Sequence, residues 1–244
     1  MSGHSKWANI KHKKEKTDSQ RAKVFTKIGK EITIAVKEGG GDPASNSKLR
    51  DLIQKAKANN VPSDNIERTI KKALGGTGES YEEVVYEGYG PAGVAVIVEA
   101  TTDNRNRTAG NIRAYFSKYH GNMGQSGCVG FMFEDKGVII ITTDEDGEID
   151  EDKLMETALE AGAEDFSGED GVYEIYTEPD DVYDIADALK SAGYEFESAE
   201  RSKIPTTTVK LDNEDDKKFM NLLIEKLEED DDVMEVYHNW EMDD

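Results

Sequence analysis

Apolar residues in the first third of the chain recur at the spacing of an amphipathic helix. Four of them follow one another at steps of three, four and three: Phe25, Ile28, Ile32 and Ala35. Residues at these steps share one face of a helix, which can then pack on a core. Asp18 is a suitable N-cap, and the three glycines at 39–41 end the pattern. The pattern predicts a helix over residues 18–38.

Two more helices are expected before residue 76. The second starts at Asp42-Pro43, because proline fits the first turn of a helix, and the third is capped by Ser63. Three short helices can enclose one small core, so we predict a helical domain over residues 18–76. The residues expected to face its core from the second and third helices are Leu49, Leu52, Ile53, Ala56, Ile66, Ile70 and Leu74.

Two later segments are each too small to fold alone. Residues 81–130 predict an alternating strand at 81–87, a buried strand at 94–100 and a helix capped by Asp103. Residues 205–244 predict a strand at 206–211, a helix and a strand at 233–240. Joined, the two segments make one sheet with two helices, which we predict as a discontinuous α+β domain.

An internal repeat lies between these two segments. A strand followed by a helix occurs twice, and the helices end at Ala161-Gly162 and Ala192-Gly193, 31 residues apart. Two such units in sequence are typical of the ferredoxin-like βαββαβ unit. The predicted fold class is therefore α+β. It has an N-terminal three-helix domain followed by two ferredoxin-like α/β domains, the last of which (131–204) is inserted in the middle one.

Charge is divided unevenly along the 244 residues. The net charge is −22, yet residues 1–75 hold 17 Lys or Arg against 8 Asp or Glu, while residues 131–244 hold 9 against 38. The Debye length is about 8 Å at physiological salt, so a distant acidic domain repels phosphate less than a nearby lysine attracts it. The net charge therefore does not exclude a nucleic-acid partner.

The basic residues suggest where such a partner would bind. Residues 1–17 have poor apolar spacing and are predicted to be a flexible basic tail, whose cations and aromatic rings suit phosphates and unpaired bases. The second and third helices resemble a helix-turn-helix, and the turn at 102–108 carries two arginines near a helix N-terminus. The residues expected to contact nucleic acid are Lys6, Trp7, Lys11, His12, Lys13, Lys14, Arg21, Lys23, Lys27, Arg68, Lys72, Arg105 and Arg107.

Each of these features has a purely structural alternative. The tail could serve only solubility, and the two helices could be an ordinary αα-hairpin with a charged surface. The arginines at 102–108 could bridge to neighbouring acidic side chains instead of binding phosphate. The alternatives stay open at the level of sequence.

A search for catalytic and metal-binding patterns fails at each candidate. Residues 88–93 match GxGxxG, but a strand follows instead of the helix that a dinucleotide site needs. A calcium loop around Gly147 would place Thr142 and Lys153 at positions that require acidic ligands. Cys128 stands where a nucleophile elbow needs its last glycine, and the four histidines are scattered. We expect no enzyme activity, no cofactor and no metal.

The apolar runs and the cysteine content bear on where the protein is located. The longest apolar run is five residues, at 94–98, and no hydrophobic segment follows the N-terminus. Cys128 is the sole cysteine, which excludes a disulfide within the chain. We expect a cytoplasmic protein with no membrane partner. Its oligomeric state is undetermined and compatible with a monomer.

Several long blocks resemble the YebC/PmpR family. The densest resemblance, over residues 3–130, lies in the runs at 3–13, 25–27, 39–43, 64–68, 86–91 and 102–108. The chain departs from the family pattern at Tyr119-His120, where glycines are usual, and at Cys128, where serine is usual. The resemblance implies an N-terminal helical domain followed by two α/β domains.

The resemblance also implies the class of function. The family is described as probable DNA-binding transcriptional regulators, and a mitochondrial relative activates translation of cytochrome oxidase. We therefore expect a non-enzymatic regulator of gene expression with one of two partners, DNA or ribosomal RNA on the ribosome. An enzyme acting between the α/β domains is a third hypothesis, which no catalytic constellation supports.

Overall fold

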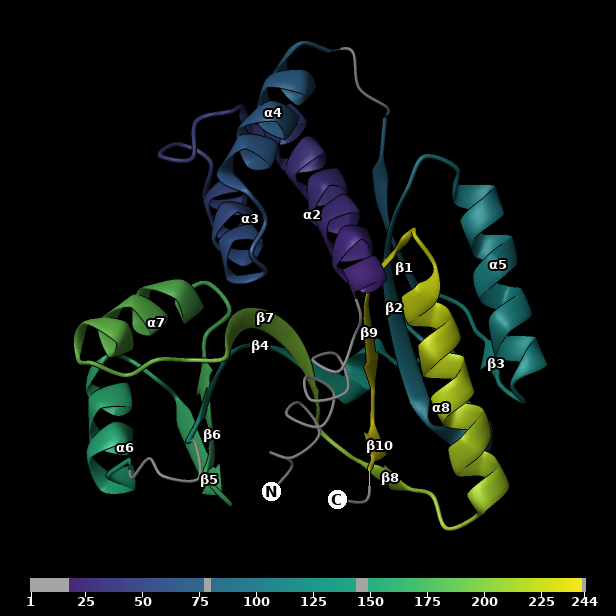
Figure 1. The fold of residues 1–244 in the computed structure, drawn as a ribbon. Coiled ribbons are helices and arrows are strands. Elements are labelled where there is room, and N and C mark those ends of the chain that lie inside the picture. Colours follow the sequence, from purple (N-terminus) through teal and green to yellow (C-terminus); the bar gives the residue numbers. More distant parts are fainter. Residues whose placement is uncertain (1–17, 77–79, 144–148, 243–244) are drawn as a thin grey trace. The chain divides into compact units, whose positions relative to one another are not determined.

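The computed structural model describes residues 18–76, 80–143 and 149–242, and for residues 18–22 and 58 it describes the backbone alone. The described chain divides into two compact units: residues 133–206, and residues 18–132 together with 207–242. The predicted flexible tail at 1–17 lies outside the described residues. The predicted α+β class with N-terminal helices is confirmed (Figure 1).

Three helices form the first part of the larger unit. They are α2 (Asp18–Gly39), α3 (Ser47–Ala58) and α4 (Ser63–Leu74). Helix α2 packs on both of the others around a core to which each helix contributes, including Ile32, Leu49 and Ile66. The apolar spacing therefore identified the three helices and most of their buried face.

Three details of this region differ from the sequence prediction. Helix α3 begins at Ser47 and not at Asp42-Pro43, because the Asn46 side chain accepts a hydrogen bond from the Leu49 amide and caps it. Ser63 is the first residue of α4 and makes no capping bond, since the N-cap is Pro62. Leu74, expected in the core, has 60% of its surface exposed because α4 ends there.

The middle domain contains a four-stranded antiparallel sheet with the order β3-β1-β2-β9. Strands β1 (Glu82–Tyr89) and β2 (Ala95–Thr102) form a hairpin, and the short β3 (Asn122–Met123) pairs with β1. Strand β9 (Val233–His238) pairs with β2 although about 130 residues separate them. A two-stranded parallel pair, β8 (Val209–Lys210) and β10 (Trp240–Glu241), lies beside the end of the chain.

Two helices cover one face of this sheet (Figure 1). They are α5 (Arg105–Lys118) and α8 (Glu214–Glu229), which bury Ile112, Phe116 and Met220 against the strands. Helix α5 is capped by Asn104, whose side chain accepts from the Arg107 amide, and not by Asp103 as predicted. The predicted strand at 206–211 is wrong in extent, because it is interrupted and only β8 remains.

The GxGxxG run forms a turn between strands. Strand β1 ends at Tyr89, a single 3-10 turn η1 (Pro91–Gly93) follows, and β2 begins two residues later. A Cβ at Gly88 would lie 2.6 Å from the carbonyl oxygen of Asn122, so glycine here permits the close approach of β3. This glycine run therefore serves strand pairing, and it opens no helix that could bind a pyrophosphate.

The smaller unit has the ferredoxin-like order. Its elements are β4 (Phe133–Thr142), α6 (Glu151–Glu160), β5 (Asp165–Glu169), β6 (Val172–Thr177), α7 (Val182–Ser191) and β7 (Ser198–Pro205). The sheet order β5-β6-β4-β7 with all neighbours antiparallel is that of a βαββαβ unit. Asp150 caps α6 by accepting a hydrogen bond from the Lys153 amide.

Candidate nucleic-acid interface

Three lysines of α2 contact an acidic segment at residues 228–232, which covers the end of α8 and the turn before β9; we call it the acidic turn. The Nζ atoms of Lys23 and Lys27 donate to the carbonyl oxygens of Glu229 and Glu228, at 2.9 and 2.8 Å. Lys30 Nζ donates to the carbonyl oxygen of Asp231 at 2.8 Å and to Asp232 Oδ1 at 2.9 Å. These bonds join the helical domain to the middle domain within one compact unit.

Asp232 is the centre of this contact. Its other carboxylate oxygen, Oδ2, accepts from Arg107 Nη2 at 2.6 Å, from Thr108 Oγ1 at 2.8 Å and from Thr102 Oγ1 at 3.3 Å. Burial by itself would raise the pKa of Asp232, but the hydrogen bonds from Arg107, Lys30 and Thr108 lower it to about 2. The Asp232 carboxylate is therefore ionised at neutral pH, and hydrogen bonds from Lys30, Arg107 and Thr108 stabilise its negative charge.

The arginine-containing turn at 102–108 is largely occupied by this network. Arg107 also donates to Asp103 Oδ1 at 2.7 Å, and its pKa is raised by the bonds to Asp232 and then Asp103. The Arg105 side chain is exposed, and it forms no hydrogen bond within the described residues. Its backbone carbonyl accepts one from the Tyr86 hydroxyl at 3.3 Å. Arg107 therefore bridges to neighbouring acidic side chains, which is the structural alternative given above for this turn. Arg105 faces solvent.

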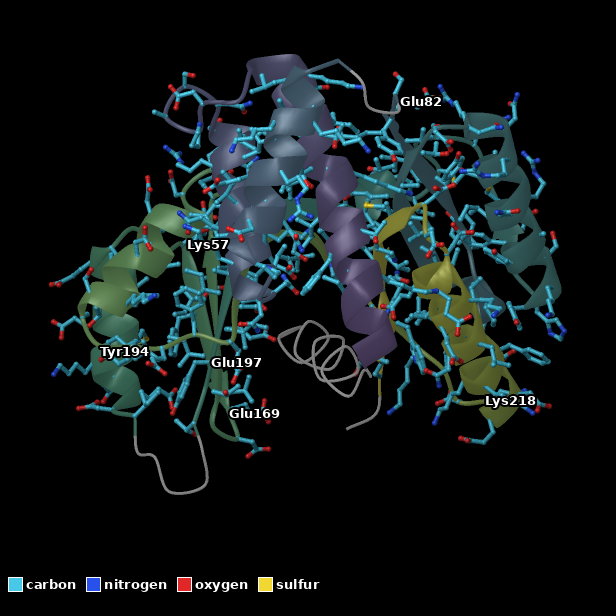
Figure 2. The ribbon with its side chains drawn as sticks, turned by 45° about the horizontal axis from the view of Figure 1, so that its top comes forward. Lys57, Glu82, Glu169, Tyr194, Glu197 and Lys218 are labelled. Atoms are coloured by element: carbon cyan, nitrogen blue, oxygen red, sulfur yellow. The ribbon has the colours of Figure 1, made fainter. Side chains whose placement is uncertain are left out.

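Helix α4 presents a different basic surface. Asn65, Arg68, Thr69 and Lys72 follow at helical spacing along one stripe, and Arg68 and Lys72 are exposed. In the part of the chain that the structure describes, neither cation forms an ion pair or a side-chain hydrogen bond. Lys57 at the end of α3, labelled in Figure 2, is a further exposed cation of the helical domain.

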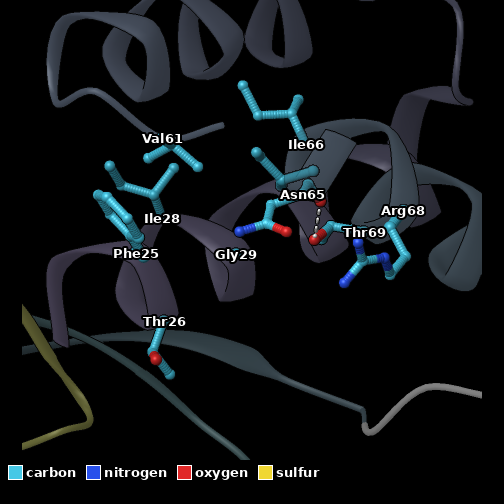
Figure 3. Close-up of a pocket in the computed structure, with 10 residues that line it drawn as sticks. Phe25, Thr26, Ile28, Gly29, Val61, Asn65, Ile66, Arg68 and Thr69 are labelled. Atoms are coloured by element: carbon cyan, nitrogen blue, oxygen red, sulfur yellow. Dashed lines mark hydrogen bonds between the residues drawn. The ribbon is translucent and has the colours of Figure 1, made fainter. Parts of the chain in front are cut away.

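A pocket opens beside this stripe, between α2 and α4 (Figure 3). Its volume is about 290 Å³, and ten residues line it. Apolar side chains such as Phe25, Ile28 and Val61 form one part, and Asn65, Arg68 and Thr69 bring polar groups. The Thr69 hydroxyl donates to the carbonyl oxygen of Asn65 at 2.8 Å, which is the bond drawn in Figure 3.

The structure brings some of the predicted residues together and leaves others unplaced. Lys23 and Lys27 meet at the acidic turn, Arg107 joins the same network, and Arg68 and Lys72 share the stripe on α4. Arg21 lies on α2, where the structure describes the backbone alone. The residues outside the described part of the chain are Lys6, Trp7, Lys11, His12, Lys13 and Lys14.

Three features escaped sequence analysis: the acidic turn as a partner of α2, the pocket, and a buried carboxylate at Glu87. Glu87 accepts hydrogen bonds from the backbone amides of Gly127, Val129 and Gly130 at 2.7 to 2.8 Å. It thereby anchors the glycine-rich loop after β3. No motif signals this role, because the carboxylate and the amides are about 40 residues apart.

The two departures from the family pattern fit this loop. His120 adopts a positive φ of 62°, a conformation that favours glycine, and its ring packs 4.0 Å from that of Phe219. Cys128 is half-buried, and burial followed by the charge of Glu87 raises the pKa of its thiol. A raised thiol pKa does not favour nucleophilic chemistry at this position.

The described residues contain neither a group of metal ligands nor a membrane-spanning helix. No group of three or more His, Cys, Asp or Glu is placed to hold a metal ion. Within the same residues, each helix is too short or too polar to cross a membrane.

Comparison with known proteins matches two segments, which together cover most of the chain, to one family. The model of the TACO1/YebC protein N-terminal domain matches residues 5–76, and that of the TACO1/YebC second and third domain matches residues 81–240.

Individual relatives match along their whole length. A protein of Ruminiclostridium cellulolyticum is 60% identical over all of this chain and 98% of its own. One of Caldicellulosiruptor bescii is 57% identical over all of this chain and 99% of its own. Both are named probable transcriptional regulatory protein. The crystal structure of a conserved hypothetical protein from Aquifex aeolicus, 46% identical, superposes with a TM-score of 0.86 over 98% of both chains. The chain belongs to the TACO1/YebC family.

Proposed function

We propose that this chain regulates gene expression in the cytoplasm by binding nucleic acid through its helical domain, without catalysing a reaction. The names of its relatives support a regulatory role. The observation that carries nucleic-acid binding is the α4 stripe, where Arg68 and Lys72 are exposed and unpaired among the described residues. Exposed cations at helical spacing neutralise phosphates and release counterions.

DNA is the first candidate partner. Helices α3 and α4 are joined by a short turn in which Asn60 adopts a φ of 58°, and short turns of this kind join the helices of a helix-turn-helix. In that motif the second helix enters the major groove. Asn65 and Arg68 on α4 are of the residue types that read adenine and guanine edges.

Ribosomal RNA is the second candidate, and the pocket beside α4 favours it. Sequence-specific RNA recognition targets unpaired bases, which need a recess with an aromatic or apolar wall and a few polar groups. The α2–α4 pocket combines such a wall at Phe25 with polar groups at Asn65 and Arg68.

Crosslinking in cells, followed by sequencing of the bound nucleic acid, tests the proposal. Recovery of ribosomal RNA would support a translational role, and recovery of a few promoter fragments a transcriptional one. If neither is enriched over a control with both Arg68 and Lys72 replaced by alanine, the proposed function is wrong.

Salt dependence tests the contribution of the basic N-terminal segment. If six to ten of the 17 Lys and Arg in residues 1–75 contact phosphates, affinity should fall about 10³–10⁵-fold between 50 and 200 mM salt. Deletion of residues 1–17 should flatten this dependence. An unchanged slope would place the phosphate contacts elsewhere on the chain.

A further inference from the structure

Helix α2 has a glycine in its interior that no packing contact requires. Gly29 lies near the middle of α2 (Asp18–Gly39), and a glycine in a helix interior lowers helix stability. A Cβ built at Gly29 meets no atom within 4 Å. No neighbouring element therefore approaches so closely that it demands glycine. Gly29 lines the α2–α4 pocket, so a side chain at this position would enter the pocket.

The polar groups of the pocket are available for a ligand. The Asn65 side-chain amide makes no hydrogen bond within the described residues, so one donor group and one acceptor group remain free. Arg68 has no acidic partner there either. Figure 3 shows both side chains beside the opening, with Phe25 and Ile28 on the other side.

We propose that this pocket receives one unpaired nucleobase of the bound strand, with Arg68 contacting its phosphate. This inference rests on the proposed function and specifies its binding mode. The Phe25 ring supplies an aromatic surface against which a base can stack, and Asn65 can donate to and accept from a base edge. Arg68 and Lys72, one helical turn apart, follow the backbone on either side of that base.

Charge and size both favour a base over other small ligands. None of the ten residues that line the pocket is acidic, and its cation lies at the side where a phosphate would sit. The volume of about 290 Å³ is at the lower end of ligand pockets, which suits one base and not an extended cofactor. A base held in a duplex must first leave its stack, so the pocket should select strands with unpaired bases.

Fluorescence of 2-aminopurine tests this binding mode directly. The probe is placed in the loop or in the stem of a hairpin oligonucleotide, made once as RNA and once as DNA. With the unaltered protein, we expect an emission change for the loop position and little change for the stem. Comparison of the RNA and DNA hairpins shows which strand the pocket accepts.

A matched pair of variants isolates the pocket. Gly29→Leu fills it, whereas Gly29→Ala adds one methyl group, and both substitutions favour the helix. We expect Gly29→Leu to weaken binding of the loop hairpin about tenfold and to abolish the emission change. Gly29→Ala, which occupies less of the pocket, should weaken binding by a smaller factor and keep the emission change. Circular dichroism and the melting temperature confirm that both variants are folded.

The possible failures have different signatures. If the unaltered protein binds neither hairpin, the proposed function fails together with this inference. If it binds loop and stem probes alike, and Gly29→Leu binds as Gly29→Ala does, the pocket takes no base although nucleic-acid binding stands.

Discussion

Helices α2 and α4 both carry cations at helical spacing, but the two sets have different surroundings. Lys23, Lys27 and Lys30 of α2 donate to the acidic turn at 228–232, and the Lys30 side chain is only 12% exposed. Arg68 and Lys72 of α4 are exposed to solvent. The same residue types therefore hold two domains together on one helix and remain available to a partner on the other.

Because of the acidic turn, we expect the α2 lysines to bind phosphate weakly in this arrangement. The turn offers them three carbonyl oxygens and the Asp232 carboxylate, so each of the three ammonium groups already has a protein acceptor. A phosphate would have to displace these bonds before it gained any of its own. On α4, a phosphate that binds Arg68 and Lys72 displaces water. Four variants or conditions test this difference between the α2 and α4 cations.

The largest effect is expected from loss of the central acid. Asp232→Ala should lower the free energy of unfolding by about 3 kcal/mol, because Lys30, Arg107 and Thr108 would lose a buried partner. Urea denaturation measures the change. Asp231→Ala is the control, since that side chain is 74% exposed and should cost no more than about 0.5 kcal/mol. Equal effects for the two variants would show that Asp232 is not the centre of the contact.

Replacing the α4 cations should produce the largest effect on binding. Arg68 and Lys72 changed together to alanine should weaken nucleic-acid affinity about 10- to 30-fold and reduce the salt slope by about two. Fluorescence anisotropy over a salt series measures both quantities. The matched control is Lys218→Ala on α8, an exposed lysine labelled in Figure 2, and its affinity should stay within about twofold. A larger loss in the control would move the binding surface to the middle domain.

Acid should weaken the contact between α2 and the acidic turn. The pKa of Asp232 is about 2 in the folded chain and 3.8 is its ordinary value, so its stabilisation is fully present above about pH 5. It is lost as the pH falls from about 5 to 1, because the unfolded state binds the proton more readily than the folded state does. We expect a loss of about 1 to 2 kcal/mol, reduced by solvent around Arg107. Asp232→Asn should remove this part of the pH dependence, and an unaltered profile in that variant would contradict the assignment.

The smallest effect is expected at Lys23. Its side chain is 45% exposed and its contacts with the acidic turn are at the surface, so Lys23→Ala should change stability by no more than about 0.5 kcal/mol. Affinity for nucleic acid should fall less than threefold. A loss as large as that of the α4 double variant would mean that the acidic turn releases α2 when nucleic acid binds.

Sequence patterns predicted the local elements well because helix and strand periodicity are local properties. The spacing of Ile28 and Ile32 identified α2, and the repeat ending at Gly162 and Gly193 identified the ferredoxin-like unit. Helix starts were less accurate, since several adjacent residues can cap a helix. Asn46 and Asn104 cap α3 and α5, although the sequence favours Asp42 and Asp103 there.

The candidate site was predicted only in part. Sequence pointed to Arg68 and Lys72, and also to Lys23, Lys27 and Arg107, without separating the two groups. The separation depends on bonds between residues that are more than 100 positions apart, such as Lys27 with Glu228 and Arg107 with Asp232. Such bonds leave no periodic trace in the chain.

The sequence by itself determined the helices and strands, the concentration of positive charge before residue 76 and the family, because each of these is written in local patterns or in contiguous motifs. Only the tertiary structure decided which cations are available. It placed the acidic turn against α2, left Arg68 and Lys72 of α4 exposed and formed a pocket that Gly29 lines. The physical reason is that a charge acts according to its three-dimensional neighbours, and the neighbours of the α2 lysines come from the far end of the chain.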